Sequence, residues 1–240
     1  MTQETYIGTG GWAYYPVPRG RNKLYEYSKK FNFVEVNFTA TEIPDFEQVA
    51  SWRKTVHDDF SFSVKCNQAV VASLRSNKVD DALLVYETML DICKILGAKI
   101  MVIQTFPDFQ FKLDFMKNMD QFLNGAYLDD VKLAWEVKGA SHFAKNFVEL
   151  IQEYNVIHAA DISLLMPIYE SDVLYTRLHG KLKGRLHHLN DHELEIVAHK
   201  IANSKARKVH VAGHTVSMYE DSERLKEILK NYSLEQTKTA

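Results

Sequence analysis

Eight short runs rich in β-branched and aromatic residues alternate along this chain with longer stretches of helical periodicity. Strands that alternate with helices form parallel sheets, because each helix returns the chain to the edge from which the next strand starts. The eight runs and the length of 240 residues favour an α/β fold, a single (β/α)8 TIM-type barrel domain over residues 1–240. The predicted strands are Tyr6–Gly10, Phe33–Thr39, Phe60–Cys66, Lys99–Thr105, Val131–Lys138, Val156–Asp161, Val173–His179 and Lys208–Gly213.

Start and stop signals mark the helices between these runs. Asp45 is expected to cap one helix, with Gln48 as its partner in a capping box. Asn190 or Asp191 is expected to begin a later one. Another helix should begin at Asp80 or Asp81, carry the apolar residues Leu84, Met89, Ile92, Cys93 and Leu96, and stop at Gly97.

A doubly wound dinucleotide-binding sheet is the competing architecture. Its fingerprint requires Gly-x-Gly-x-x-Gly between a strand and a helix. The segment Gly8-Thr-Gly-Gly lacks the third glycine, and Pro16 and Pro18 follow where the helix would start. The closed barrel is therefore the better prediction.

Composition excludes several classes of function. The net charge of −2 gives no general attraction to nucleic acids or membranes. No stretch approaches the roughly 18 apolar residues of a membrane span, and the N-terminus does not resemble a signal peptide. Cys66 and Cys93 lie in apolar segments without a metal or redox motif, so both are expected to be buried free thiols. A cytoplasmic protein without membrane partners is expected.

Side chains alternate between two faces along a strand, and the strands of this chain divide accordingly. One set is apolar, such as Val34, Val36 and Phe38 in the second strand or Leu174 and Leu178 in the seventh. The other set becomes polar or ionisable near the carboxyl ends of the strands, where TIM-type barrels build their active sites. Its members are Glu35, Lys65, Gln104, Glu136, Lys138, Asp161, Arg177, His179 and His214.

A purely structural interpretation of this set remains open. Buried charges are tolerated where they pair with each other, and Arg177 could form such a pair with Glu136 or Asp161. Placing so many ionisable groups at one end of a barrel is nevertheless costly without a use. The set as a whole therefore indicates a functional site.

Several motifs resemble those of the YecE-like proteins, also called domain of unknown function 72. They include Gly8-Thr-Gly-Gly-Trp-Ala-Tyr, Val34-Glu-Val-Asn, Phe60-Ser-Phe-Ser-Val-Lys, Gln104 with Pro107, Trp135-Glu-Val and Tyr175-Thr-Arg-Leu-His-Gly. The resemblance runs from about Ile7 to Leu229 and implies a barrel fold, but no settled activity. Two departures matter: Lys138 stands where the family usually has arginine, and Ala212-Gly213-His214 replaces a usual Phe-Asn-Asn.

The first hypothesis is an enzyme that acts on a small anionic molecule, phosphorylated or sugar-like. Arg177 would bind the anion in a bidentate fork, with Lys65 or Lys138 as a further positive charge. Glu35 or Glu136 would act as general base and His179 as general acid. The remaining predicted binding residues are Asn37, Gln104, Gly10 and Gly11; the N–H groups around the two glycines could hold a phosphate, although a tight turn explains them equally well.

The second hypothesis is a divalent-metal hydrolase, including an endonuclease of the endonuclease IV-like type. The candidate metal ligands are Glu35, Glu136, Asp161, His179 and His214. Basic residues between positions 177 and 214 could contact nucleic acid, but a solvated basic face is the commoner explanation. A third hypothesis is a non-catalytic binding protein that keeps a barrel pocket.

Overall fold

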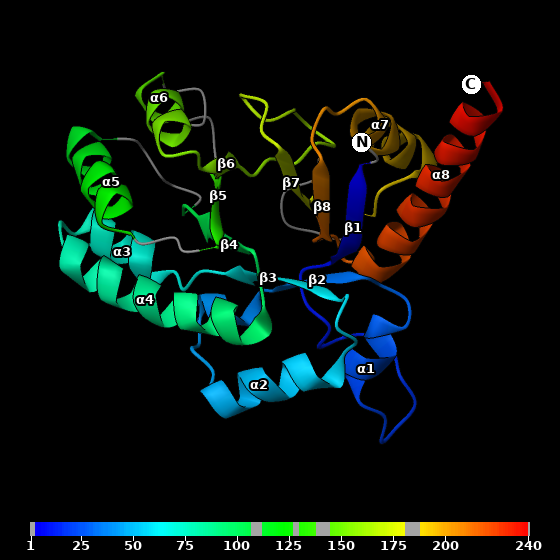
Figure 1. Cartoon of the computed structure of the whole chain (residues 1–240), viewed down its shortest axis with the longest axis horizontal. Helices are drawn as coiled ribbons and strands as arrows, with labels where there is room; N and C mark the ends of the chain where they lie inside the picture. The colour runs from blue at the N-terminus through cyan, green and yellow to red at the C-terminus, as the bar shows by residue number, and fades with distance from the viewer. Residues whose placement is uncertain (1–2, 107–111, 127–129, 138–144, 181–187, 240) are drawn as a thin grey trace. The chain divides into compact units, whose positions relative to one another are not determined.

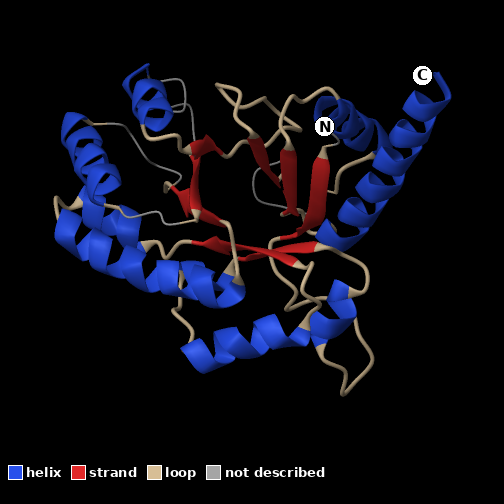
Figure 2. Ribbon diagram, viewed as in Figure 1, coloured by secondary structure: helices blue, strands red, loops and turns tan. Residues whose placement is uncertain are grey.

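The computed structural model describes residues 3–106, 112–126, 130–137, 145–180 and 188–239. Eight strands form one parallel sheet in the order β6-β5-β4-β3-β2-β1-β8-β7 (Figures 1 and 2). They are β1 (Glu4–Thr9), β2 (Phe33–Val36), β3 (Ser61–Lys65), β4 (Ile100–Gln104), β5 (Lys132–Glu136), β6 (Ile157–His158), β7 (Val173–Leu178) and β8 (Lys208–Gly213). Each overlaps a predicted strand, and β6 is much the shortest of them.

The pairing continues beyond β6 through a single bridge. Ala160 pairs in parallel with Thr176 of β7. Its N–H donates to the Tyr175 carbonyl at 3.3 Å, and the Arg177 N–H donates to the Ala160 carbonyl at 3.3 Å. The strand order together with this bridge is the pairing pattern of a (β/α)8 barrel.

A helix follows each strand except β6, which leads directly to β7, and two helices follow β3. The helices are α1 (Lys23–Ser28), α2 (Phe46–Thr55), α3 (Ala69–Arg75), α4 (Val79–Leu96), α5 (Leu113–Gly125), α6 (Lys145–Glu153), α7 (Asp191–Ala202) and α8 (Met218–Thr239), with a short 3-10 turn η1 (Phe38–Ala40) after β2. In the part of the chain that the structure describes, none of these helices is long and apolar enough to cross a membrane.

The chain divides into two compact units, Met1–Val34 with Ala160–Ala240 and Glu35–Ala159. The first contains β1, β7, β8, α1, α7 and α8, and the second contains β3 to β6 and α2 to α6. The organisation of residues 1–240 as one domain stays a prediction.

In the first unit, apolar side chains of β7 and β8 face the helices. Leu174 and Leu178 of β7 and Val209 and Val211 of β8 belong to one buried cluster. The same cluster contains Leu194, Val197, Ala198 and Ile201 of α7 and Leu225 of α8, and α8 lies along β1 and β8 (Figure 1). The predicted alternation of faces is therefore confirmed for these two strands.

The opposite face of these strands carries a cluster of rings around His210. Tyr6 stacks on the His210 ring at 4.7 Å between centroids, and Phe33 meets it edge-on at 5.3 Å. Tyr175 stacks more distantly, at 6.1 Å. Burial among these rings lowers the pKa of His210 to about 3, and the charge of Lys208 acts in the same direction.

This lowered pKa predicts that His210→Phe reduces the sensitivity of the protein to acid. Above its ordinary pKa of 6.5, His210 is neutral in both states and contributes nothing to pH dependence. Below pH 6.5 the unfolded chain binds a proton at His210 that the folded chain does not bind. The free energy of unfolding therefore falls by about 1.4 kcal/mol for each unit by which the pH is lowered, until about pH 3. Between pH 7 and pH 5, urea unfolding should show the variant losing about 2 kcal/mol less than wild type. His192→Phe is the control, because His192 is exposed on α7; equal losses in wild type and His210→Phe would refute the assignment.

Helix ends follow the predictions in part. Asn190 caps α7 in a complete capping box with Glu193, and Gly97 ends α4 with φ of 68° in the left-handed region. Asp45 occupies the N-cap of α2, but its side chain makes no capping hydrogen bond, so the predicted capping box with Gln48 is wrong.

Two apolar side chains of the predicted elements are exposed. Leu84 is exposed on α4, whereas Met89, Ile92, Cys93 and Leu96 of the same helix are buried. Phe38 is exposed as well, because the chain leaves β2 after Val36 and turns into η1. The alternation of a strand does not continue into a 3-10 turn, where side chains follow a period of about three.

Candidate functional site

Four predicted site residues lie in the second unit, on neighbouring strands. Glu35 is in β2 and fully buried, and Lys65, Gln104 and Glu136 are the last residues of β3, β4 and β5. Asn37, a predicted binding residue, lies between β2 and η1 and is partly buried. Three consecutive strands thus end in a polar side chain.

Gln104 and Glu136 are joined by a hydrogen bond. They are partners in the register of β4 and β5, and neighbouring strands lie roughly 4.8 Å apart, so two side chains on the same face meet. The Gln104 Nε2 group donates to Glu136 Oε2 at 2.5 Å. Only 4% of Glu136 is exposed, so the amide both orients this carboxylate and compensates part of its loss of water.

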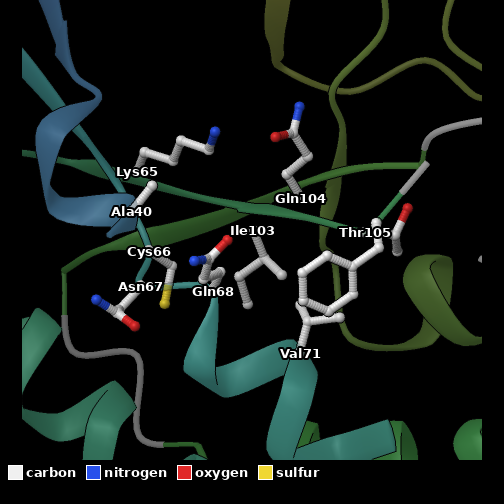
Figure 3. A pocket seen from close by; sticks show the side chains of 10 residues that line it. Ala40, Lys65, Cys66, Asn67, Gln68, Val71, Ile103, Gln104 and Thr105 are labelled. Atoms are coloured by element: carbon white, nitrogen blue, oxygen red, sulfur yellow. The ribbon is translucent and has the colours of Figure 1, made fainter. Parts of the chain in front are cut away.

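A pocket of about 150 Å³ opens beside these strand ends. It is lined by Ala40, Lys65, Cys66, Asn67, Gln68, Val71, Ile103, Gln104, Thr105 and Phe106. Figure 3 shows Lys65 and Gln104 on one side of the two strands, and Cys66, Ile103 and Val71 on the other. The pocket therefore has a polar rim and an apolar floor.

Hydrogen bonds hold the wall of this pocket in place. The Thr39 hydroxyl donates to the Lys65 carbonyl at 2.6 Å, and Asn67 Nδ2 donates to the Thr39 carbonyl at 3.1 Å. Asn67 Oδ1 accepts from the Ala69 N–H at 3.0 Å, and the Gln68 N–H donates to the Ala40 carbonyl at 3.0 Å. The turn after β3 is thereby tied to η1, which makes the pocket a preformed feature of the unit.

Both cysteines are buried free thiols, as predicted. Burial raises the pKa of the Cys66 thiol to about 12, and it also raises the pKa of Cys93. The thiolate is the reactive form, so both cysteines should react with a thiol-labelling disulfide at pH 8 at least about 100-fold more slowly in the folded protein than in denaturant. Labelling of Cys66→Ser and Cys93→Ser would identify each rate. Rapid labelling of either cysteine in the native state would contradict this expectation.

The other predicted residues that the structure describes lie in the first unit, where Asp161 organises a turn. Asp161 Oδ2 accepts hydrogen bonds from the backbone N–H groups of His179 and Gly180 at 2.9 and 3.0 Å. Its Oδ1 accepts from the N–H and hydroxyl of Ser163 at 3.0 and 2.6 Å. Oδ2 thus fixes the chain after β7 and Oδ1 fixes the turn that follows Asp161 itself, which gives this carboxylate a positioning function that its sequence position did not reveal.

His179 and His214 form a stacked pair. Their ring centroids are 4.9 Å apart, with an angle of 29° between the planes. The backbone N–H of His214 donates to the Leu178 carbonyl at 2.8 Å, which places the two histidines side by side at the ends of β7 and β8. A Cβ atom on Gly10 would lie 2.1 Å from Cε1 of His214, so the pair has room only because residue 10 is glycine.

The N–H groups of Thr9 and Gly10 are engaged within the protein. The Thr9 N–H donates to the Tyr27 hydroxyl at 2.9 Å, and the Gly10 N–H donates to the Gly213 carbonyl at 2.9 Å. Gly11 has φ of 126°, and its carbonyl accepts from the Thr9 hydroxyl at 2.7 Å. These contacts are those of a tight turn, and the binding of an anion at Gly10 and Gly11 stays a prediction.

Arg177 is buried in β7, with 1% of its surface exposed. Lys138 lies outside the described residues. Within the described residues, no group of three or more His, Cys, Asp or Glu side chains is arranged to hold a metal ion.

Three of the described basic residues between 177 and 214 form ion pairs with acidic residues. Lys205 pairs with Glu170 at 3.3 Å, Lys208 pairs with Glu4 at 3.4 Å, and Arg207 pairs with Asp172. Lys200 donates instead to the Ile162 carbonyl at 2.6 Å, and the basic residues at positions 181, 183 and 185 lie outside the described residues. Contact of this region with nucleic acid stays a prediction.

Several solved structures have a fold similar to that of this chain. A DUF72 family protein from Enterococcus faecalis V583 is 18% identical over 95% of this chain and 98% of that chain, with a TM-score of 0.74. One from Thermotoga maritima MSB8 is 17% identical over 95% and 100%, with a TM-score of 0.76. A xylose isomerase domain protein from Planctomyces limnophilus is 12% identical over 97% of both chains, with a TM-score of 0.53. The protein is a (β/α)8 barrel of the TIM type, as predicted.

The sequence also matches the model of a protein family. A family model described as Protein of unknown function DUF72 matches residues 6–239. The chain therefore belongs to the DUF72 family, which its motifs resemble. No functionally curated protein matches the chain.

Proposed function

We propose that this protein is an enzyme that acts on a small anionic molecule by general acid/base chemistry, with Glu136 as the base. The observation that carries the proposal is the hydrogen bond from Gln104 to the buried Glu136 carboxylate, next to a pocket that Gln104 and Lys65 line. A positioned carboxylate beside a pocket with a cationic rim is the minimal equipment for removing a proton from a bound anion.

Each part of this arrangement has a separate task. Lys65 attracts the anion, and its attraction is stronger at a partly buried rim than in bulk water. Gln104 holds one oxygen of Glu136 and so limits the orientations of the carboxylate. A proton acceptor that is already oriented avoids the cost of ordering it in the transition state.

The remaining roles stay predictions. Arg177 is proposed to bind an anion and His179 to donate a proton, and Glu35 is the second candidate base. The alternatives are a divalent-metal hydrolase, including an endonuclease, and a non-catalytic binding protein. Among the described residues, no observation favours either alternative over the acid/base proposal.

A ligand screen tests the proposal. The purified protein would be mixed with small carboxylates, sugar acids and sugar phosphates, with and without Mg²⁺, Mn²⁺ or Zn²⁺, and followed by thermal shift and by NMR detection of products. We expect anions to raise the melting temperature, Lys65→Met to weaken this effect, and at least one compound to be converted. Stabilisation without conversion would support a binding protein, and conversion only with a metal would support the hydrolase.

A further inference from the structure

The loop after β1 and the short helix α1 bring together positive charge and exposed aromatic rings. From position 19 to position 30 the chain has five basic residues and one acidic residue, a local net charge of +4 in a chain whose net charge is −2. The basic residues are all exposed, and they are Arg19, Arg21, Lys23, Lys29 and Lys30. Tyr14 and Tyr25 belong to the same part of the chain, with 85% and 49% of their surfaces exposed. We call residues 13–30 the basic segment.

Little negative charge opposes these cations within the segment. Glu26 is its one acidic residue, and it pairs with Lys29 at 2.9 Å and with Arg21 at 3.9 Å. Arg19 and Lys30 form no ion pair with any residue that the structure describes. The segment thus keeps an excess of positive charge that an anionic partner would neutralise.

Residues around the segment do not cancel this excess. Lys226 of α8 donates to the Lys30 carbonyl, and the carboxylate of Glu223, which lies near Lys226, offsets that further positive charge. Three exposed basic residues elsewhere in the first unit each have their own acidic partner, namely Lys205, Arg207 and Lys208. The basic segment differs from those positions, because it has five cations for one carboxylate.

An aromatic contact holds the segment in shape on its buried side. The Tyr15 ring meets the Tyr27 ring edge-on, with 5.4 Å between the centroids. The Lys23 ammonium group donates to the Ala13 carbonyl at 2.5 Å, which ties the first residue of α1 to the start of the segment. Tyr14 lies in the chain between Ala13 and Tyr15, yet its ring is exposed. The ring is therefore presented to solvent on a backbone that is already fixed, which reduces the entropy lost on binding.

Cations at this spacing match the phosphates of a nucleic acid strand. Arg19 and Lys23 lie at most about 14 Å apart along the chain, with Arg21 between them. Lys29 joins this group through the carboxylate that it shares with Arg21. Guanidinium groups bind phosphate oxygens through two parallel hydrogen bonds. An exposed tyrosine ring provides a face on which an unpaired base stacks, whereas the base faces of a duplex are already covered by their neighbours.

An anionic membrane is a poorer match for the segment. Segments that insert into a membrane surface use Trp, Phe or Leu side chains. The exposed positions from 13 to 30 contain none of these residues, and their only aromatic side chains are Tyr14 and Tyr25. The Lys29 ammonium group lies over the Tyr25 ring, 4.3 Å from its centroid. Tyr14 is therefore the better ring for stacking.

We propose that the basic segment is a binding surface for single-stranded nucleic acid, in which Arg19, Arg21 and Lys29 contact the phosphates. A base of the strand stacks on Tyr14. This binding function goes beyond the proposed enzyme and does not rest on it, because the basic segment belongs to the first unit and Glu136 to the second. Cleavage of the strand is no part of the inference.

The test is the fluorescence anisotropy of a labelled single strand of about 12 nucleotides, titrated with the full chain at several salt concentrations. Arg19→Gln combined with Arg21→Gln should weaken binding at least about tenfold at about 50 mM salt. The double variant should also reduce the slope of log Kd against log salt by about 1.4, because each phosphate contact of a single strand contributes about 0.7. Lys54→Gln combined with Lys117→Gln is the matched control, since it removes two exposed cations from α2 and α5.

The role of Tyr14 is tested by two substitutions that differ in the ring. Tyr14→Ala should weaken binding at least about fivefold, and Tyr14→Phe, which keeps the stacking face, should bind within about twofold of wild type. Because residue 14 is exposed, neither change should lower the melting temperature. Equal binding by Tyr14→Ala and wild type would contradict the stacking.

Other results would overturn the inference as a whole. They are no binding by the wild type at about 100 µM protein, equal losses in the arginine variant and its control, or a duplex of the same length bound more tightly than the single strand. Tighter binding to phosphatidylserine vesicles than to the single strand would also overturn it and would assign the surface to a membrane. None of these outcomes concerns Glu136, whose part in the proposed function is decided separately by the ligand screen.

Discussion

Replacing Glu136 by glutamine is expected to lower the turnover of the substrate by about 100- to 10,000-fold, the range that a positioned general base contributes. Glutamine has the same shape as glutamate and keeps an oxygen that can accept the hydrogen bond from Gln104 Nε2. It cannot accept a proton at neutral pH. Binding of the substrate and the thermal stability should therefore change little, while the rate of the chemical step falls.

Glu87→Gln is the matched control, because Glu87 is exposed on α4 in the same unit and undergoes the same chemical change. Rates would be measured by NMR with the compound that the screen identifies, under saturating and limiting concentrations. Because the substitution is aimed at the chemical step, kcat and kcat/KM should fall together. A rate within about threefold of wild type would exclude Glu136 as the base and leave Glu35 as the remaining candidate.

Among the described glycines of the first unit, Gly8→Ala is expected to cause the largest loss of stability by the addition of one methyl group. A Cβ atom at this position would lie 1.8 Å from the carbonyl oxygen of Phe33 and 2.7 Å from the Tyr27 hydroxyl. That hydroxyl donates to the same carbonyl at 2.8 Å and accepts from the Thr9 N–H at 2.9 Å. The clash is with backbone, which cannot rotate away, so the free energy of unfolding should fall by at least about 4 kcal/mol.

Gly125→Ala introduces the same methyl group where it can be accommodated. Its nearest neighbour would be Cδ1 of Leu83 at 3.2 Å, the end of a flexible side chain, and Gly125 lies in α5, where alanine is the better helix former. Guanidinium unfolding should place this control within about 1 kcal/mol of wild type. Equal stability of the two variants would show that β1 and β2 can separate without cost.

The strands and their faces could be predicted because they depend on local patterns. Leu174, Leu178, Val209 and Val211 face α7 and α8, as alternation alone requires. The turn after β2 could not be predicted in this way. Phe38 continues the apolar alternation in the sequence, yet it lies in η1 and is exposed. The strand ends at Val36, whose carbonyl accepts a hydrogen bond from the Thr39 hydroxyl at 2.8 Å.

The candidate site was predictable in its residues but not in their connections. The alternation of faces along each strand indicates Gln104 and Glu136 separately as site residues. Their hydrogen bond depends on the register between β4 and β5. Asp161 is a candidate metal ligand from its sequence position alone. Its Oδ2 accepts hydrogen bonds from the N–H groups of a turn that begins eighteen residues away, a contact that no local spacing encodes.

The floor of the pocket was missed altogether. Val71 comes from α3 and Ile103 from β4, and in the sequence both belong to ordinary apolar patterns. The position of Asn67 and Gln68 does indicate the pocket, because they directly follow a strand end, where polar residues of a barrel often line a site. The residues that directly follow β3 and β4 make up half of the lining.

The contact between Gly10 and His214 has an evolutionary consequence. Residue 10 has no side chain where the imidazole lies, so each position sets the size allowed at the other. A larger residue at position 10 becomes tolerable only after the histidine has been replaced by something smaller. The two positions are therefore expected to covary among homologues, and the order in which the two changes arise determines which ancestral intermediates were viable.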